Sequence, residues 1–239
     1  MATQLFIGTS GWHYKHWLGR FYPQGTDGEE MLPFYARHFS TVEVNNTYYQ
    51  LPERETVTHW REQVPQEFTF VVKANRYITH MKKLKDPQEP LANMLSRVAM
   101  LGDKLGPILF QLPPHWHFNA GRLQSFLEQL PEDRRAVFEF RDPSWFNEQA
   151  YGLLRAHDAA FCMHDHGGRT TPKEITAGFI YIRFHGGSEQ GSYSTQTLAG
   201  WAGAISTWRQ DHDVYCYFNN DWEGYALDNA RELCDMLSG

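Results

Sequence analysis

The chain has 239 residues, of which 41% are hydrophobic and 15% aromatic, and its formal net charge is −6 at pH 7. This length supports one large hydrophobic core and predicts a single domain over residues 1–239. The acidic balance argues against nucleic acid as a partner, and no run approaches the roughly eighteen apolar residues of a membrane helix, so no membrane partner is expected.

Eight short apolar runs recur roughly thirty residues apart and are typical of buried strands. They span residues 5–7, 42–44, 68–73, 108–111, 137–140, 161–164, 179–184 and 214–218. Between most of them lie segments with helical periodicity, at residues 30–39, 87–101, 120–130, 147–157, 197–209 and 225–237. After the sixth run, residues 167–177 are rich in Gly, Thr and Pro, which predicts an irregular crossover.

Repeated alternation of strand and helix favours a parallel sheet, and eight units in about 240 residues favour closure into one α/β barrel of the TIM type, (β/α)8. Polar side chains in such a barrel gather at the carboxyl ends of the strands. Three strands end in a polar pair at i and i+2, which places both members on one face. The pairs are Glu43 with Asn45, Glu139 with Arg141, and Arg183 with His185.

Four of these strand-end residues are candidate catalytic groups. Glu43 and Glu139 suit general acid and base roles, and His185 suits proton transfer. Lys73 follows an apolar run that could depress its pKa and make it a nucleophile or proton shuttle, although an ion-paired role in binding an anion is the simpler interpretation. The competing interpretation of the whole set is a buried network of compensating charges.

The predicted ligand is a small anionic molecule. Arg141 and Arg183 offer guanidinium groups shaped for phosphate or carboxylate, and the loop after the third strand is locally basic. Aromatic side chains at the same end suit a sugar face or a nucleobase. The remaining candidate binding residues are Trp12, Tyr14, Asn45, Gln111, Asp165, Tyr193, Asn219 and Asn220.

The tripeptide His164-Asp165-His166 has the residue types of a metal site. Strand alternation points Asp165 away from both histidines, so a divalent metal is not favoured, no metal ligand is assigned, and the cofactor stays unknown. The glycines after the strands match neither a dinucleotide fingerprint nor a phosphate-binding loop. Three scattered cysteines without close pairing favour a reducing cytoplasm.

Six short motifs occur in order along the chain: GTSGW at 8–12, TVEVN at 41–45, QLPP at 111–114, EFR at 139–141, RFHG at 183–186 and YFNN at 217–220. Together they resemble the YecE-like family, the domain of unknown function 72. The resemblance covers nearly the whole chain and implies a TIM barrel of bacterial type. It implies no reaction, because the family has no settled activity.

Two functions of different kinds follow from these residues. The first is an enzyme, whether hydrolase, isomerase or lyase, that acts on a phosphorylated sugar or nucleotide-like substrate by general acid-base chemistry. The second is a protein that binds a small ligand or a nucleic-acid end at the same place without turnover. The enzyme is favoured because acid-base residues outnumber what recognition needs, and a monomer is slightly favoured over an oligomer.

Overall fold

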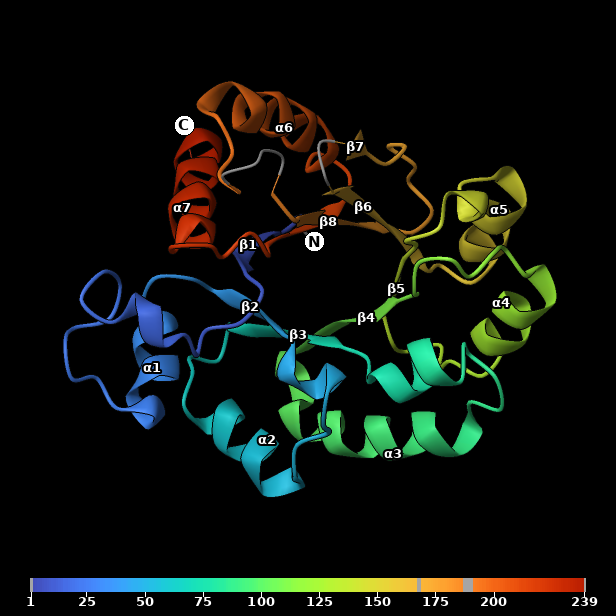
Figure 1. The fold of residues 1–239 in the computed structure, drawn as a ribbon, viewed down its shortest axis with the longest axis horizontal. Helices are drawn as coiled ribbons and strands as arrows, with labels where there is room; N and C mark the ends of the chain where they lie inside the picture. Colours follow the sequence, from blue (N-terminus) through green and yellow to red (C-terminus); the bar gives the residue numbers. More distant parts are fainter. Residues whose placement is uncertain (1, 167–168, 187–190, 239) are drawn as a thin grey trace.

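The computed structural model describes residues 2–166, 169–186 and 191–238. Eight parallel strands form a ring that helices cover from outside (Figure 1), so the predicted TIM-type barrel is confirmed. The parallel strands are β1 (Leu5–Thr9), β2 (Thr41–Val44), β3 (Thr69–Lys73), β4 (Leu105–Gln111), β5 (Ala136–Glu139), β6 (Ala160–His166), β8 (Phe179–Phe184) and β9 (Asp213–Phe218).

The ring closes between β1 and β2, the two ends of the strand order β1-β9-β8-β6-β5-β4-β3-β2. They meet at a parallel bridge between Ser10 and Glu43. Gly8 makes this approach feasible, because a Cβ at that position would lie 2.4 Å from the carbonyl oxygen of Thr41. A glycine therefore stands where the two strand backbones approach too closely for a side chain.

The helices that follow the strands are α1 (Gly28–Tyr35), α2 (Arg54–Glu62), α3 (Gln88–Val98), α4 (Ala120–Leu127), α5 (Glu148–Ala156), α6 (Thr195–Trp208) and α7 (Tyr225–Leu237). Six of them fall on predicted helical segments, with ends shifted by a few residues. Helix α2 was not predicted. Its apolar stripe is sparse, because only Val57 and Trp60 within the helix, followed by Val64, face the core among many charged residues.

The sixth crossover is irregular, as predicted. After β6 the chain forms a two-residue strand, β7 (Arg169–Thr170), which pairs antiparallel with β6. The described part of the chain between β6 and β8 contains no helix. Residues 167–168 of this predicted irregular segment lie outside the described residues.

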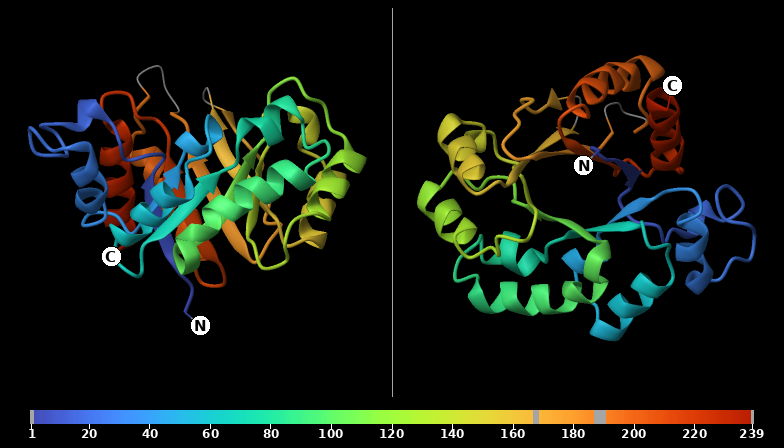
Figure 2. Two further views of the ribbon diagram at one scale, coloured as in Figure 1. Left: turned by 90° about the horizontal axis from the view of Figure 1, so that it is seen from below. Right: turned by 180° about the vertical axis from the view of Figure 1, so that it is seen from behind.

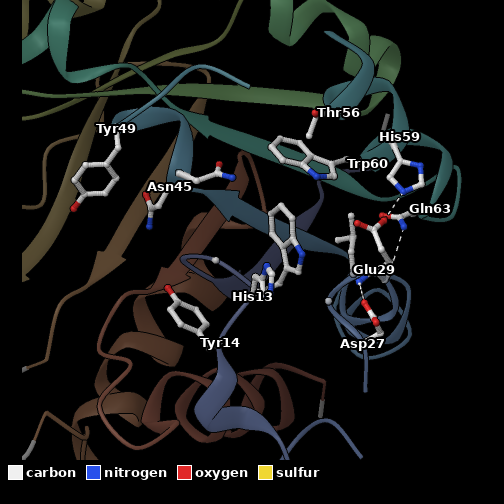
Figure 3. Close-up of a pocket in the computed structure, with 15 residues that line it drawn as sticks. His13, Tyr14, Asp27, Glu29, Asn45, Tyr49, Thr56, His59, Trp60 and Gln63 are labelled. Carbon is white, nitrogen blue, oxygen red and sulfur yellow. Dashed lines mark hydrogen bonds and ion pairs between the residues drawn. The ribbon is translucent and has the colours of Figure 1, made fainter. Parts of the chain in front are cut away.

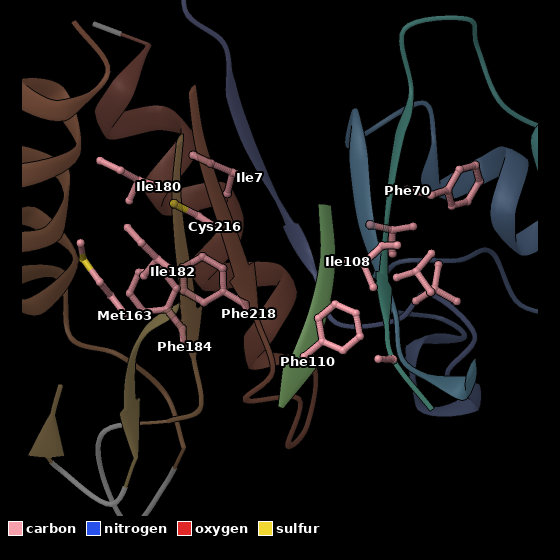
Figure 4. Packing of buried hydrophobic residues seen from close by; sticks show 14 of the residues in the cluster. Ile7, Phe70, Ile108, Phe110, Met163, Ile180, Ile182, Phe184, Cys216 and Phe218 are labelled. Atoms are coloured by element: carbon pink, nitrogen blue, oxygen red, sulfur yellow. The ribbon is translucent and has the colours of Figure 1, made fainter. Parts of the chain in front are cut away.

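Buried apolar side chains form two layers because successive strand residues point to opposite faces. One layer packs between the strands and the helices and includes Phe70, Phe110, Ile182 and Phe218 (Figure 4). The other fills the ring and consists of Phe6, Val71, Leu109, Val137, Ala160, Cys162, Phe179, Tyr181, Tyr215 and Tyr217. The filled interior leaves the carboxyl ends of the strands, which we call the mouth, as the place for polar groups. The N-terminus lies at the other end of the ring (Figure 2, left).

Candidate functional site

Arg183 lies between two carboxylates at the mouth. Its Nη2 donates to Glu43 Oε1 at 2.6 Å, and its Nη1 donates to Glu139 Oε2 at 2.6 Å. None of the three side chains has exposed surface. Burial of these charges is tolerated because each one meets an opposite charge at hydrogen-bond distance. We call Glu43, Glu139 and Arg183 the buried triad.

Both carboxyl groups of the triad are held in the ionised form. Burial by itself raises the pKa of Glu43, but the Arg183 guanidinium outweighs it, and hydrogen bonds from Tyr181 and Ser10 at 2.6 and 2.7 Å add to the lowering. The pKa of Glu139 lies well below its ordinary value, because the charges of Arg183 and Arg141, with a hydrogen bond from His185, overcome the same effect of burial.

Arg141 and His185 lie around Glu139 on the mouth side of the triad. Arg141 Nη2 is 2.5 Å from Glu139 Oε1, and His185 Nε2 is 3.1 Å from the same oxygen and 2.8 Å from Arg141 Nη2. Burial, aided by the two guanidinium groups, lowers the pKa of His185 to about 3. The imidazole is therefore neutral at physiological pH, and its single N–H can serve only one partner at a time.

Lys73 closes β3 and differs from the arginines in its surroundings. Its Nζ lies 4.4 Å from the centroid of the Tyr48 ring, and no carboxylate among the described residues forms an ion pair with it. Burial and then the charge of Arg183 lower the pKa of the amine to about 8. Lys73 is thus a cation that readily gives up its proton and has a ring, rather than an acid, beside it.

These six side chains form the mouth cluster: Glu43, Lys73, Glu139, Arg141, Arg183 and His185. It contains three cations against two carboxylates, with a neutral histidine. The predicted residues Gln111 and Asn219 join it. Gln111 Nε2 donates to Glu139 Oε1 at 2.9 Å, and Asn219 Nδ2 lies 3.1 Å from His185 Nδ1.

Three other predicted residues lie apart from the mouth cluster in a supporting hydrogen-bond network. Asp165 accepts from the His185 backbone N–H at 2.9 Å and from the Tyr193 hydroxyl. Asn220 Nδ2 donates to Gly191 O at 2.7 Å and to Asn229 Oδ1 at 2.9 Å. Through Asp165 the network fixes the backbone that carries His185, so its members act on the mouth indirectly.

The remaining predicted residues, Trp12, Tyr14 and Asn45, line a cavity of about 670 Å³ that we call the side pocket (Figure 3). It lies between the segments after β1 and β2 and the helices α1 and α2. Tyr49, His59 and Trp60 also line it, whereas the buried triad does not. This cavity therefore lies next to the mouth cluster rather than above it.

Two residues that donate hydrogen bonds to Glu43, Tyr181 and Ser10, were not predicted from the sequence. Tyr181 stands two residues before Arg183 and so points into the same ring, which strand alternation could have revealed. Ser10 follows β1, and its hydroxyl reaches Glu43 only because β1 and β2 meet at the closure of the ring. No signal in its own segment indicates this contact.

Within the described residues, no three His, Cys, Asp or Glu side chains are placed to hold a metal ion. His164 is buried, with its ring 5.8 Å from that of His185. The same residues contain no helix with the length and apolar character needed to cross a bilayer.

The fold and the mouth cluster define a (β/α)8 barrel with a charged site at the carboxyl ends of its strands. Residues 6–239 match the family model described as protein of unknown function DUF72, and the chain belongs to this family. It is 26% identical to the UPF0759 protein YunF of Bacillus subtilis (strain 168), over 98% of this chain and 94% of that protein. It is 32% identical to the UPF0759 protein YecE of Escherichia coli (strain K12), over 59% of this chain and 50% of that protein.

Solved structures agree with this assignment. A DUF72 family protein (TM1631) from Thermotoga maritima MSB8 is 29% identical and superposes with a TM-score of 0.87, covering 99% of this chain and 100% of that one. A DUF72 family protein (EF0366) from Enterococcus faecalis V583 is 22% identical with a TM-score of 0.85, covering 99% of this chain and 96% of that one, and shows the same fold. These relatives establish family and architecture, while the chemistry has to be argued from the site.

Proposed function

We propose that this protein is an enzyme that binds a small anionic substrate, of the phosphorylated-sugar or nucleotide-like class, at the mouth and transfers a proton there. The observation that carries the proposal is the Lys73 amine, which has no carboxylate ion pair among the described residues and feels the charges of two arginines that are already paired with carboxylates. An anionic group on the ligand is the partner that this arrangement lacks.

Proton transfer falls to Lys73 and His185 in this proposal. With a pKa of about 8, about one Lys73 amine in ten is neutral at pH 7 and able to accept a proton. His185 is neutral and can accept or donate through either nitrogen. Glu43 and Glu139 serve as fixed counter-charges, since both are ionised, buried and engaged by Arg183.

A screen followed by a turnover assay tests the proposal. Thermal shifts of the purified protein with sugar phosphates, nucleotides and dicarboxylates identify ligands of the native state. Lys73→Met and Arg141→Met should abolish the shifts. Arg155→Met is the matched control, because it also removes one positive charge, but from the exposed last turn of α5 at the other end of the barrel.

Each ligand found is then incubated with the wild-type protein and followed by NMR for product. Consumption that stops in Lys73→Met or His185→Gln supports the enzyme. If no anion shifts the melting temperature, or if Arg155→Met has the same effect as Lys73→Met, the proposal is rejected.

A binding protein without turnover is the second candidate. It is favoured by the full burial of Glu43 and Glu139, which leaves neither carboxylate a surface on which to meet a substrate. In that case ligands bind the wild-type protein, Lys73→Met lowers their affinity, and no ligand is consumed.

We also propose a cytoplasmic location. Cys162, Cys216 and Cys234 are free thiols, which suits a reducing compartment. A reporter fused to the C-terminus and assayed after cell fractionation tests this.

A further inference from the structure

The side pocket is connected to the mouth cluster through two adjacent tyrosines. Tyr49 lines the pocket, its ring packs edge-on against that of Tyr48 at 5.0 Å, and Tyr48 lies 4.4 Å from Lys73 Nζ. Asn45, a second lining residue, is two positions beyond Glu43 of the triad. The pocket is also within the usual size range of small-molecule sites, which is about 300–1,000 Å³.

Two indole rings form a corner in this pocket. Trp12 is buried, Trp60 is partly exposed, and their centroids lie 5.4 Å apart with the planes at 85°. A flat nucleobase is held best between parallel ring faces. A corner formed by the face of one indole and the edge of the other instead fits a puckered saturated ring. Such a ring has an apolar C–H side and hydroxyl groups around its rim.

The polar groups of the pocket suit hydroxyls and disfavour an anion. No described lysine or arginine lines it, whereas Asp27 and Glu29 lie at the end away from Tyr49 (Figure 3). Glu29 Oε2 is 2.8 Å from His59 Nε2, and no side chain among the described residues donates to its other oxygen, which can accept from a hydroxyl. Carboxylates at this end repel an anionic group and turn it towards Lys73.

From this geometry we infer that the side pocket holds a neutral hydroxylated ring, so that the ligand of the mouth is a sugar bearing a phosphate or similar anion. That the ligand carries an anionic group at the mouth rests on the proposed function. That its ring is neutral and hydroxylated rests on the side pocket alone. Of the two substrate classes proposed for the mouth, the pocket therefore selects the phosphorylated sugar over the nucleotide.

Calorimetric titrations with three probes test the inference: inorganic phosphate, a panel of hexose phosphates, and the matching methyl hexosides. At least one hexose phosphate should bind about tenfold or more tightly than phosphate. Trp60→Ala should remove that gain and leave phosphate binding unchanged, while Lys73→Met should weaken phosphate and hexose phosphate alike. Thr56→Trp, on an exposed position that lines the pocket, should block the ring without removing any core side chain, so the test survives if Trp60→Ala fails to fold.

The outcomes separate this inference from the proposed function. If phosphate does not bind but methyl hexosides do, and Thr56→Trp abolishes that binding, the pocket is supported and the proposed function fails. If phosphate binds but no hexose phosphate gains affinity, the inference is overturned and the proposed function stands. A larger gain for nucleoside monophosphates than for every hexose phosphate also overturns it.

Discussion

Arg183 and Glu43 are 140 residues apart in the chain, yet their charged atoms lie 2.6 Å apart with no exposed surface on either side chain. They come from β8 and β2, which are not neighbours in the ring, so the ion pair crosses the interior. Arg183 also reaches Glu139 on β5. One guanidinium therefore ties three strands together at the mouth.

Arg183→Met should destabilise the protein by about 3–5 kcal/mol at pH 7, because it leaves two carboxylates buried without their main partner. In the wild type their folded pKa values lie below 4.5, so the triad stabilises the fold above that pH and the contribution is lost as the pH falls. In the variant, burial raises these pKa values, so stability should recover on acidification. Urea unfolding at pH 7 and pH 5 measures both effects.

Arg155→Met, on the surface, is the control for this measurement and should change the free energy of unfolding by no more than about 1 kcal/mol at either pH. An equal loss for Arg183→Met at pH 7 and pH 5 would show that uncompensated carboxylates are not the cause.

His185→Gln should make the protein less sensitive to acid. The folded pKa of His185 is about 3 and its ordinary value is 6.5, so below pH 6.5 the unfolded chain takes up a proton that the folded one refuses. This single group should lower wild-type stability by about 1.4 kcal/mol per pH unit on acidification. Between pH 6.5 and 4.5 the free energy of unfolding, measured in urea, should therefore change less with pH for the variant than for the wild type. An equal pH dependence in the two proteins would contradict the lowered pKa of His185.

Much of the mouth could be predicted from the sequence because two simple periodicities determine it. Strand alternation puts Glu139 and Arg141 on one face, and likewise Arg183 and His185, and the closed ring of a (β/α)8 barrel then brings the faces together. Partners within the ring could not be predicted. That Arg183 rather than Lys73 neutralises both carboxylates depends on the register and tilt of strands far apart in sequence.

The side pocket and the supporting network lay beyond sequence reasoning for a different reason. The pocket is built partly by α2, whose apolar stripe is too sparse to have been recognised, and by the way α2 packs near α1. Asp165 was predicted as a binding residue from its place at a strand end; strand alternation points it away from the ring interior, and there it accepts from Tyr193, a contact that the sequence did not indicate. Such contacts depend on how loops and helices pack outside the barrel.

Sulfate binding should be lost as the pH rises through about 8. Sulfate keeps its charge across this range, so a decline reports deprotonation of the Lys73 ammonium. The association constant should fall by up to about tenfold per pH unit above that value. Lys73→Arg keeps its charge and should bind sulfate equally well at pH 7 and pH 9.5. Calorimetry over this range measures both proteins, and a flat wild-type profile would exclude Lys73 as the anion ligand.

Gly8→Ala should weaken the closure of the ring. The added Cβ would lie 2.4 Å from the backbone oxygen of Thr41, so β1 and β2 must separate at the place where Ser10 reaches Glu43. We expect a loss of about 1–3 kcal/mol in the free energy of unfolding, the usual cost of overpacking.

Gly200→Ala is the matched control, since nothing lies within 4 Å of a Cβ there and the residue is exposed on α6. Removing that helical glycine should stabilise the protein by about 0.5–1 kcal/mol. Urea unfolding measures both changes in the free energy of unfolding. A loss for Gly8→Ala with a gain for Gly200→Ala would support a close approach of the strands at Gly8. Gains for both would show that β1 and β2 have space for a methyl group there.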